Sequence, residues 1–260
     1  MTLQPGGRSG AHAPWRTGVP VAGRRVPPEL AGVAVLALHN VAVHRLLTAP
    51  ADAALNLATA VGLAGFARRV GCSDGDLGIR PEDAASGLRL GLAAAALAGG
   101  AVAIGAAVPG IRRFFDDRRV RDASRRQAGY HLAVRIPLAT ALAEELLFRG
   151  ALLALLRRER SPAAAVAWTS LLFGAWHVLP TLEDYHGNPA STLVGNPGRG
   201  QWLAVLATTA STAAAGSGFA WLRLRSRSLV APVLAHAALN ASAYLAGRWV
   251  VRSGVSRASG

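Results

Sequence analysis

Seven long runs of apolar residues constrain the fold of this chain more than any other feature of its sequence. They are residues 30–47, 53–67, 88–108, 130–156, 163–179, 202–222 and 229–251. Most approach the ~20 residues that an α-helix needs to cross the hydrocarbon core of a bilayer. Hydrophobic residues make up 52% of the chain and charged residues only 16%, which fits a soluble domain poorly. The sequence therefore predicts an all-α fold, a polytopic transmembrane helical bundle with about seven (six to eight) spans.

The basic residues indicate which partners the chain meets. All 28 are arginine, and the formal net charge is +14. Since these arginines flank the apolar runs, anionic lipid headgroups are the expected partner, and nucleic acid is not. The absence of lysine and the abundance of alanine are typical of a bacterium with a GC-rich genome. Cys72 is the single cysteine, so no intrachain disulfide can form, and we interpret it as a small interfacial residue rather than a reactive thiol.

Composition divides the chain into five parts. Residues 1–28 are rich in Pro, Gly and Arg and predict a disordered basic tail, and residues 252–260 predict a short C-terminal tail. Three leading transmembrane helices are expected in 29–110. The charged connector 111–129 predicts an amphipathic helix on the membrane surface. The unusual polar residues concentrate in the four helices expected within 130–251.

Arginine clusters predict an orientation in the membrane. They follow the fourth and sixth apolar runs, at 157–160 and 223–227, whereas the loop 181–200 carries Glu183 and Asp184. The positive-inside rule places the clusters in the cytoplasm and the loop outside. Counting back through seven full spans places the basic connector outside, against the same rule, unless an early run fails to cross or an extra break exists. The expected location is the cell inner (plasma) membrane, as a multi-pass protein.

Two adjacent glutamates and an arginine interrupt the fourth run at Glu144, Glu145 and Arg149. Ionisable residues at membrane depth are costly and are therefore functional candidates. Residues four apart share a helical face, which pairs Glu145 with Arg149, while Glu144 is rotated about 100° away. The unpaired Glu144 suits proton transfer from and to water. The alternative for Glu145 and Arg149 is an ion pair that only ties helices together.

Two further pairs of residues four apart occur on later runs. Phe173 and His177 share a face of the fifth run, and His236 and Asn240 share a face of the last. Each pair alone is explained by hydrogen bonds between packed helices. The same interpretation, polar residues for helix packing, applies to three residues of the first run: His39, Asn40 and His44.

Taken together, Glu-Glu-x-x-x-Arg, Phe-x-x-x-His and His-x-x-x-Asn occur in this order on separate runs. This pattern resembles the CAAX-protease and bacteriocin-processing (CPBP, or Abi) family of intramembrane proteases, which includes the type II CAAX prenyl endopeptidases. The surrounding segments FRGALL, SLLFGAWH and SLVAPVLAH are similar as well. The resemblance covers roughly residues 130–250, and the first 110 residues support it only as a variable set of leading helices.

The resemblance implies an active site buried in a helical bundle. Four residues would be catalytic, with water activated by Glu144 and His177 and the oxyanion stabilised by His236 and Asn240. Three residues would order the site: Glu145, Arg149 and Phe173. Such a set holds a base, a second proton-handling group and oxyanion donors, which together suffice for water attack on an amide.

The resemblance leaves open whether the reaction requires a metal ion. Members of the family are often described as metalloproteases, and Glu144, His177 and His236 would be the ligands of a Zn²⁺ with an open position. The sequence has no His-Glu-x-x-His motif, and a metal-free glutamate protease fits the same residues. No cofactor is therefore certain, and zinc is the one that the residues would suit.

The expected function is that of an intramembrane (metallo)endopeptidase that hydrolyses a peptide bond of a membrane-anchored protein or peptide. The alternative is a non-catalytic membrane scaffold, or an immunity or regulatory protein of the same fold. Retention of every motif residue favours proteolysis over this alternative. A small transporter would show paired repeats with broken helices, and the sequence has no internal repeat.

Overall fold

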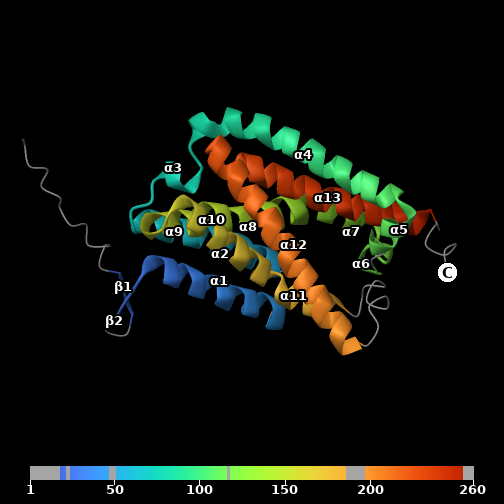
Figure 1. Cartoon of the computed structure of the whole chain (residues 1–260), viewed down its shortest axis with the longest axis horizontal. Helices are drawn as coiled ribbons and strands as arrows, with labels where there is room; N and C mark the ends of the chain where they lie inside the picture. The colour runs from blue at the N-terminus through green and yellow to red at the C-terminus, as the bar shows by residue number, and fades with distance from the viewer. Residues whose placement is uncertain (1–17, 22–23, 47–50, 116–117, 186–196, 254–260) are drawn as a thin grey trace, which may run out of the picture.

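The computed structural model describes residues 18–21, 24–46, 51–115, 118–185 and 197–253, which are almost entirely helical (Figure 1). The longer α-helices are α1 (Pro28–Arg45), α2 (Ala51–Arg69), α4 (Ala84–Ala107), α10 (Pro162–Trp176), α12 (Pro197–Ser226) and α13 (Val230–Arg252). Each overlaps one of the apolar runs of the sequence. The prediction of an all-α fold is confirmed.

Four helical segments in the described ranges are long and apolar enough to cross a membrane. They are Asp74–Ala107, Pro162–Asp184, Gly198–Ser226 and Val230–Arg252. The chain is therefore a helical membrane protein, although these four segments do not establish the expected number of about seven spans. Among the described residues, the first, second and fourth apolar runs are not in this set.

One continuous helix carries the two adjacent glutamates. It consists of α7 (Arg125–Tyr130), η4 (His131–Leu142), α8 (Ala143–Glu145), η5 (Leu146–Leu152) and α9 (Leu153–Glu159). The segments η4 and η5 are π-helical, with wider turns than an α-helix. Pro137 lies inside η4 and lacks the N–H that the helix would use there. Since π-helical turns are frequent at functional sites, the residues around α8 are candidates for such a site.

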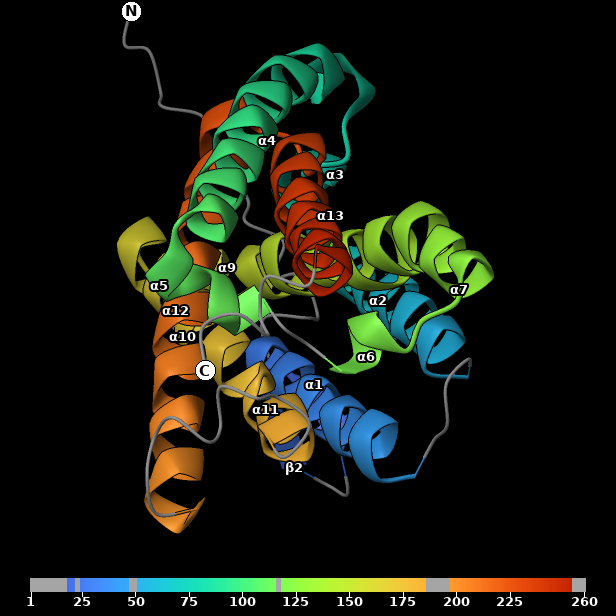
Figure 2. The ribbon, with the colours of Figure 1, turned by 90° about the vertical axis from the view of Figure 1, so that its right-hand side faces the viewer.

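Helices α4 and α13 lie side by side along one side of the bundle in both views (Figures 1 and 2). Gly87 and Gly91 of α4 make this close approach possible, as in other small-xxx-small pairs of membrane helices. A Cβ at Gly91 would stand 2.9 Å from the Cα of Ala231, and one at Gly87 would stand 2.6 Å from Oγ of Ser228. The contact fixes the position of α13, on which His236 lies.

Replacing Gly91 by alanine is expected to lower the free energy of unfolding in detergent by about 1–3 kcal/mol, because the added methyl group overpacks the α4–α13 contact. Gly100→Ala is the matched control, since a Cβ at Gly100 meets no atom within 4 Å. Denaturant unfolding of both purified variants measures the difference. Equal stability of the two variants would contradict the close packing of α4 against α13.

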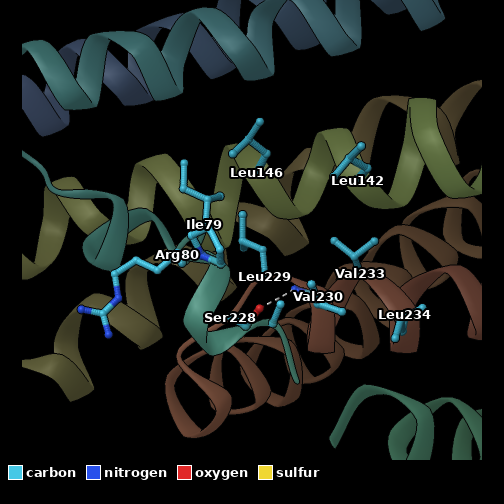
Figure 3. A pocket seen from close by; sticks show the side chains of 12 residues that line it. Ile79, Arg80, Leu142, Leu146, Ser228, Leu229, Val230, Val233 and Leu234 are labelled. Carbon is cyan, nitrogen blue, oxygen red and sulfur yellow. Dashed lines mark hydrogen bonds between the residues drawn. The ribbon is translucent and has the colours of Figure 1, made fainter. Parts of the chain in front are cut away.

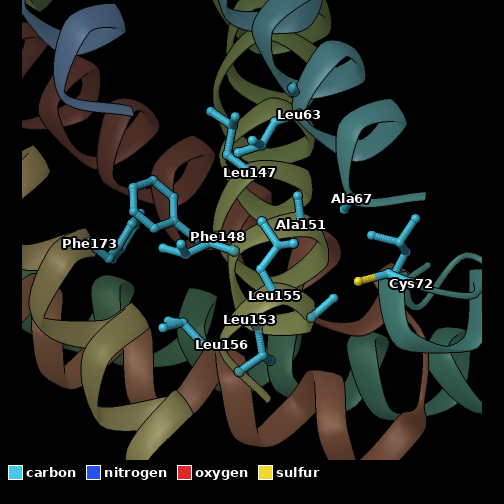
Figure 4. Close-up of a cluster of buried hydrophobic side chains, with 14 of the residues drawn as sticks. Leu63, Ala67, Cys72, Leu147, Phe148, Ala151, Leu153, Leu155, Leu156 and Phe173 are labelled. Carbon is cyan, nitrogen blue, oxygen red and sulfur yellow. The ribbon is translucent and has the colours of Figure 1, made fainter. Parts of the chain in front are cut away.

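The hydrophobic core gathers around the C-terminal half of the glutamate-bearing helix. Leu147, Phe148, Ala151 and Leu155 are almost fully buried there, and Phe173 of α10 packs against them (Figure 4). Helices α1 and α2 add Leu36, Leu63 and Ala67 to the same cluster. The leading helices thus share one core with the helices that follow them.

Part of the expected N-terminal tail is structured. Strands β1 (Val19–Val21) and β2 (Arg24–Val26) pair antiparallel, with Val19 opposite Val26. Valine favours extended backbone, which the interpretation of this segment as disordered overlooked. Residues 1–17 and 254–260, which contain most of the two expected tails, lie outside the described residues.

The connector is not the single amphipathic helix that its charges predicted. It comprises the end of α5 (Pro109–Arg112), η3 (Arg113–Phe115), α6 (Arg118–Arg121) and the start of α7. Ser124 begins α7 with a capping box, which separates this helix from α6. Arg248 of α13 donates a hydrogen bond to the carbonyl of Ala123 at 3.1 Å, so the connector packs on α13.

Short helices complete the fold. They are α3 (Asp74–Leu77), η2 (Pro81–Asp83) and α11 (Val178–Asp184). Arg223 of α12 donates to the carbonyls of Gly75 and Asp76 at 2.8 Å each and so ties α12 to α3. Gly78 ends α3 in the left-handed conformation, with φ of 75°, which favours glycine.

Candidate active site

Glu144 and Glu145 lie on α8, between the two π-helical segments. Glu145 has no exposed surface and Glu144 is 8% exposed. Nη1 of Arg149 donates to Oε1 of Glu145 at 3.1 Å, and both side chains of this pair are fully buried. The predicted i, i+4 ion pair is therefore present, and Glu144 is left outside it.

Arg149 is enclosed by aromatic rings. Its guanidinium carbon lies 4.1 Å from the ring centroid of Phe173 and 5.4 Å from that of Phe219. The ring of Phe148 is a third neighbour at 5.8 Å. Gly216 of α12 leaves room for the guanidinium, because a Cβ there would stand 2.8 Å from Nη2 of Arg149. Cation–π contacts of this kind contribute about 2 kcal/mol when they are desolvated.

His236 of α13 connects the two glutamates. Its Nδ1 lies 2.9 Å from Oε1 of Glu145, and its Nε2 lies 3.9 Å from Oε2 of Glu144. Because an ionised carboxylate only accepts hydrogen bonds, Nδ1 carries a proton. Nε2 therefore faces Glu144 across a gap that is too long for a hydrogen bond. The ring of Phe219 stacks on the imidazole at 4.9 Å and holds its orientation.

Within the described ranges, Glu144 has no close ion-pair partner. Arg149 bonds Glu145 instead, and Nε2 of His236 is 3.9 Å from Oε2 of Glu144. Oε2 of Glu144 is buried and has no hydrogen-bond partner among the described residues. Such an atom is rare in proteins, and this one is placed to take or give a proton.

His177 lies at the corner between α10 and α11. Its Nδ1 donates to the carbonyl of Phe173 at 2.8 Å, so Nε2 is the nitrogen left to accept a proton. The ring of Phe173 lies 4.8 Å from the ring of His177 and 5.9 Å from that of His236. Within the described part of the chain, no hydrogen bond or ion pair joins His177 to Glu144 or Glu145. The structure thus links His177 to the cluster through Phe173.

Asn240 follows His236 by one turn of α13 and lines an open cavity of about 500 Å³. Thr140, which precedes Glu144 by four residues, lines the same cavity, so the cavity lies about one helical turn from Glu144 and from His236 along their helices. Arg135 is a third lining residue, and its Nη2 is paired with Oδ2 of Asp52 at 2.7 Å. The cavity therefore carries polar groups of both the glutamate-bearing helix and α13.

A second cavity, of about 380 Å³, is mainly apolar (Figure 3). Leu142 and Leu146 of the glutamate-bearing helix line it, together with Val233 and Leu234 of α13. Its lining suits the apolar part of a chain embedded in a membrane. Since it lies between the same two helices, it adds apolar surface close to the polar cluster.

The expected zinc ligands are not arranged as a metal site. Among the described residues, no group of three or more His, Cys, Asp or Glu side chains is placed to hold a metal ion. Nδ1 of His177 bonds a backbone carbonyl, and Nδ1 of His236 bonds Glu145. The arrangement of these described residues does not fit a metal ion held by Glu144, His177 and His236.

Cys72 has the surroundings of an unreactive thiol. It is buried, and Nη1 of Arg158 lies 3.9 Å from its sulfur. Burial raises the pKa of the Cys72 thiol above its ordinary value, although Arg158 acts in the opposite direction. A thiol with a raised pKa is a poor nucleophile at neutral pH, which agrees with the interpretation from sequence.

Several polar residues near the cluster were missed by the interpretation of the sequence. The bond between His236 and Glu145 was not expected, nor was the cavity beside Asn240. Helical spacing could have indicated two of the residues that line this cavity. Thr140 lies one turn before Glu144, and Tyr244 lies one turn after Asn240. Both additional residues line the cavity.

Fold and site together define a helical membrane protein with a buried cluster of carboxylate, imidazole and guanidinium groups. Residues 127–242 match the family model described as "Type II CAAX prenyl endopeptidase Rce1-like". The match contains all three motifs that the sequence suggested. No curated protein and no solved structure matches the chain significantly.

Proposed function

We propose that the protein is an intramembrane endopeptidase that cleaves a peptide bond of a membrane-anchored protein or peptide. The family of residues 127–242 suggests protease activity. The observation that carries the proposal is the buried Oε2 of Glu144, which has no hydrogen-bond partner among the described residues and faces Nε2 of His236 at 3.9 Å. This carboxylate can accept a proton from water, because Arg149 is paired with Glu145 and not with Glu144.

The proposed reaction uses Glu144 as general base and then as general acid. Glu144 accepts one proton of water while the water oxygen attacks the carbonyl carbon of the scissile bond. The carbon–nitrogen bond then breaks, and Glu144 returns the proton to the leaving amine. A protonated His236 and the amide of Asn240 donate to the oxyanion, and removing one such donor costs about 10²–10³-fold in rate. His177, which packs against the ring of Phe173, acts as a second group that transfers protons. Glu145, Arg149 and Phe173 order the site.

The proposed location is the inner (plasma) membrane, with several crossings of the chain. The four long apolar helices support insertion, and the arginines that flank the apolar runs suit contact with anionic lipid headgroups. The apolar cavity beside α13 would accommodate an apolar part of the substrate. A non-catalytic scaffold or immunity protein is the alternative, and it requires none of the proton chemistry of Glu144.

The proposal is tested by comparing the membrane proteomes of cells that express the wild-type protein or the Glu144→Gln variant at equal levels. We expect at least one membrane protein to accumulate uncleaved in the variant, with loss of the matching terminal fragment. Identical membrane proteomes in the two cultures, with no protein accumulating uncleaved in the Glu144→Gln variant, would support the non-catalytic alternative.

A further inference from the structure

We propose that His39, Asn40 and Asn56 of the leading helices position the candidate active site from outside the matched segment 127–242. We call these three residues the polar clamp. The proposal rests on the proposed function for its catalytic readout, while its structural readout is independent of activity. One arm of the clamp reaches the glutamate-bearing helix, and the other reaches the corner that carries His177.

The first arm is a chain of hydrogen bonds that begins at Thr59 of α2. Its Oγ1 lies 2.9 Å from Nδ1 of His39, and Nε2 of His39 lies 2.7 Å from Oδ1 of Asn56. Nδ2 of Asn56 then donates to the carbonyl of Ala139 at 3.1 Å. Because Oδ1 of Asn56 can only accept, Nε2 of His39 carries the proton and Nδ1 accepts from the hydroxyl of Thr59. Every group in this chain therefore has a defined donor or acceptor role.

The end point of this arm is close to the proposed base along the helix. Ala139 is 3% exposed and precedes Glu144 by five residues, about one turn of a π-helix. The hydrogen bond from Asn56 to this carbonyl fixes the rotation of the helix about its axis, at a place where the backbone hydrogen bonds of the helix are π-helical. Since Glu144 projects from the next turn, the bond from Asn56 sets the direction of the carboxylate.

The second arm holds the end of α10. Nδ2 of Asn40 donates to the carbonyl of Trp176 at 3.0 Å, and Trp176 is the last residue of this helix. The last carbonyls of a helix lack intrahelical donors and need partners inside a membrane. The ring of His39 also stacks on the ring of Trp176, with centroids 5.4 Å apart and planes within 6°. The next residue is His177, so both contacts fix the corner from which its imidazole projects.

His39 belongs to both arms of the clamp. Its ring bonds Asn56 on one side and stacks on Trp176, so its loss would displace the glutamate-bearing helix and the His177 corner together. A displacement of about 1 Å in an active site costs about 10²-fold in rate, even when the changed residue does not touch the substrate. A purely structural role predicts lower stability without a separate effect on kcat. We assign His39 as a positioning residue.

The catalytic test compares His39→Ala, His39→Gln and His44→Ala as purified proteins in lipid nanodiscs. The probe is a quenched fluorescent peptide spanning the cleavage site found with the Glu144→Gln variant. We expect His39→Ala to lower kcat by about 10–100-fold with KM nearly unchanged. Glutamine at position 39 can still donate to Asn56 and is expected to restore most of kcat. His44 is the matched control, because its ring pairs with Glu183 at 2.9 Å on α11.

The structural test uses ¹⁵N-histidine NMR of the same variants without substrate. We expect the Nε2–H tautomer at His39, the Nδ1–H form at His177, and a shifted His177 signal in His39→Ala but not in His44→Ala. An unchanged His177 signal and unchanged kcat in His39→Ala would overturn the clamp. If His39→Ala does not fold, Asn56→Ala is measured instead. This variant removes only the first arm, and kcat then reports whether Glu144 is still correctly positioned. If the wild-type protein does not cleave the peptide, the proposed function is contradicted. The NMR spectra alone then test whether the polar clamp positions His177.

Discussion

Replacing Glu144 by glutamine is expected to lower kcat by about 10²–10⁴-fold while the helical bundle stays folded. The amide is nearly isosteric with the carboxylate, but it cannot take a proton from water at neutral pH. Glu144 is the carboxylate that Arg149 leaves free, and its buried Oε2 faces His236. Turnover of an identified substrate by the purified variant in liposomes measures the effect, and the melting temperature checks the fold.

Glu145→Gln is the matched control for this prediction. Oε1 of Glu145 accepts from Arg149 at 3.1 Å and from His236 at 2.9 Å, and an amide oxygen can accept both hydrogen bonds. We therefore expect this variant to retain part of its activity. Comparable losses in both variants would contradict the division of roles between the two glutamates. Activity that is lost with a chelator and restored by Zn²⁺ would instead assign both carboxylates to a metal.

Arg149→Ala is expected to destabilise the protein by about 3–5 kcal/mol, because it leaves the buried charge of Glu145 without its partner. Arg149 and Glu145 have no exposed surface, so solvent cannot replace the lost ion pair. The aromatic rings of Phe148, Phe173 and Phe219 would also lose the guanidinium that they enclose. Unfolding by denaturant in detergent measures the loss, which should be accompanied by lower expression.

Arg157→Ala provides the control for this second prediction. Arg157 lies two turns further along the same helix and is exposed, so its removal leaves no buried charge behind. We expect its stability to stay within about 0.5 kcal/mol of the wild type. An Arg149→Ala variant that is as stable as Arg157→Ala but inactive would place Arg149 in the chemistry rather than in the support of Glu145.

The position of the helices and one ion pair could be predicted from the sequence. Long apolar runs select helices in a membrane because the bilayer provides no partner for an unpaired backbone group. The pairing of Glu145 with Arg149 depends only on local helical spacing, and it forms as predicted. The order of the three motifs was likewise sufficient to indicate the family model that residues 127–242 match.

Local spacing could not predict how the motifs meet. His236 was expected to act beside Glu144, and it also bonds Glu145 through Nδ1, 91 residues away in the sequence. His177 was expected to activate water together with Glu144, and in the structure its ring packs against the ring of Phe173, which also contacts His236. These relations depend on the relative rotation and depth of separate helices, which packing decides and hydropathy does not encode.

The sequence by itself determined that the chain is a helical membrane protein and which residues carry unusual polarity. Only the tertiary structure decided which of these residues share hydrogen bonds. His39 and Asn40 appeared from sequence to be packing residues of variable leading helices, and Asn56 was not singled out. In the folded chain they reach the carbonyls of Ala139 and Trp176. The physical reason is that a buried polar group must find its partner wherever packing places one, and that place can lie far along the chain.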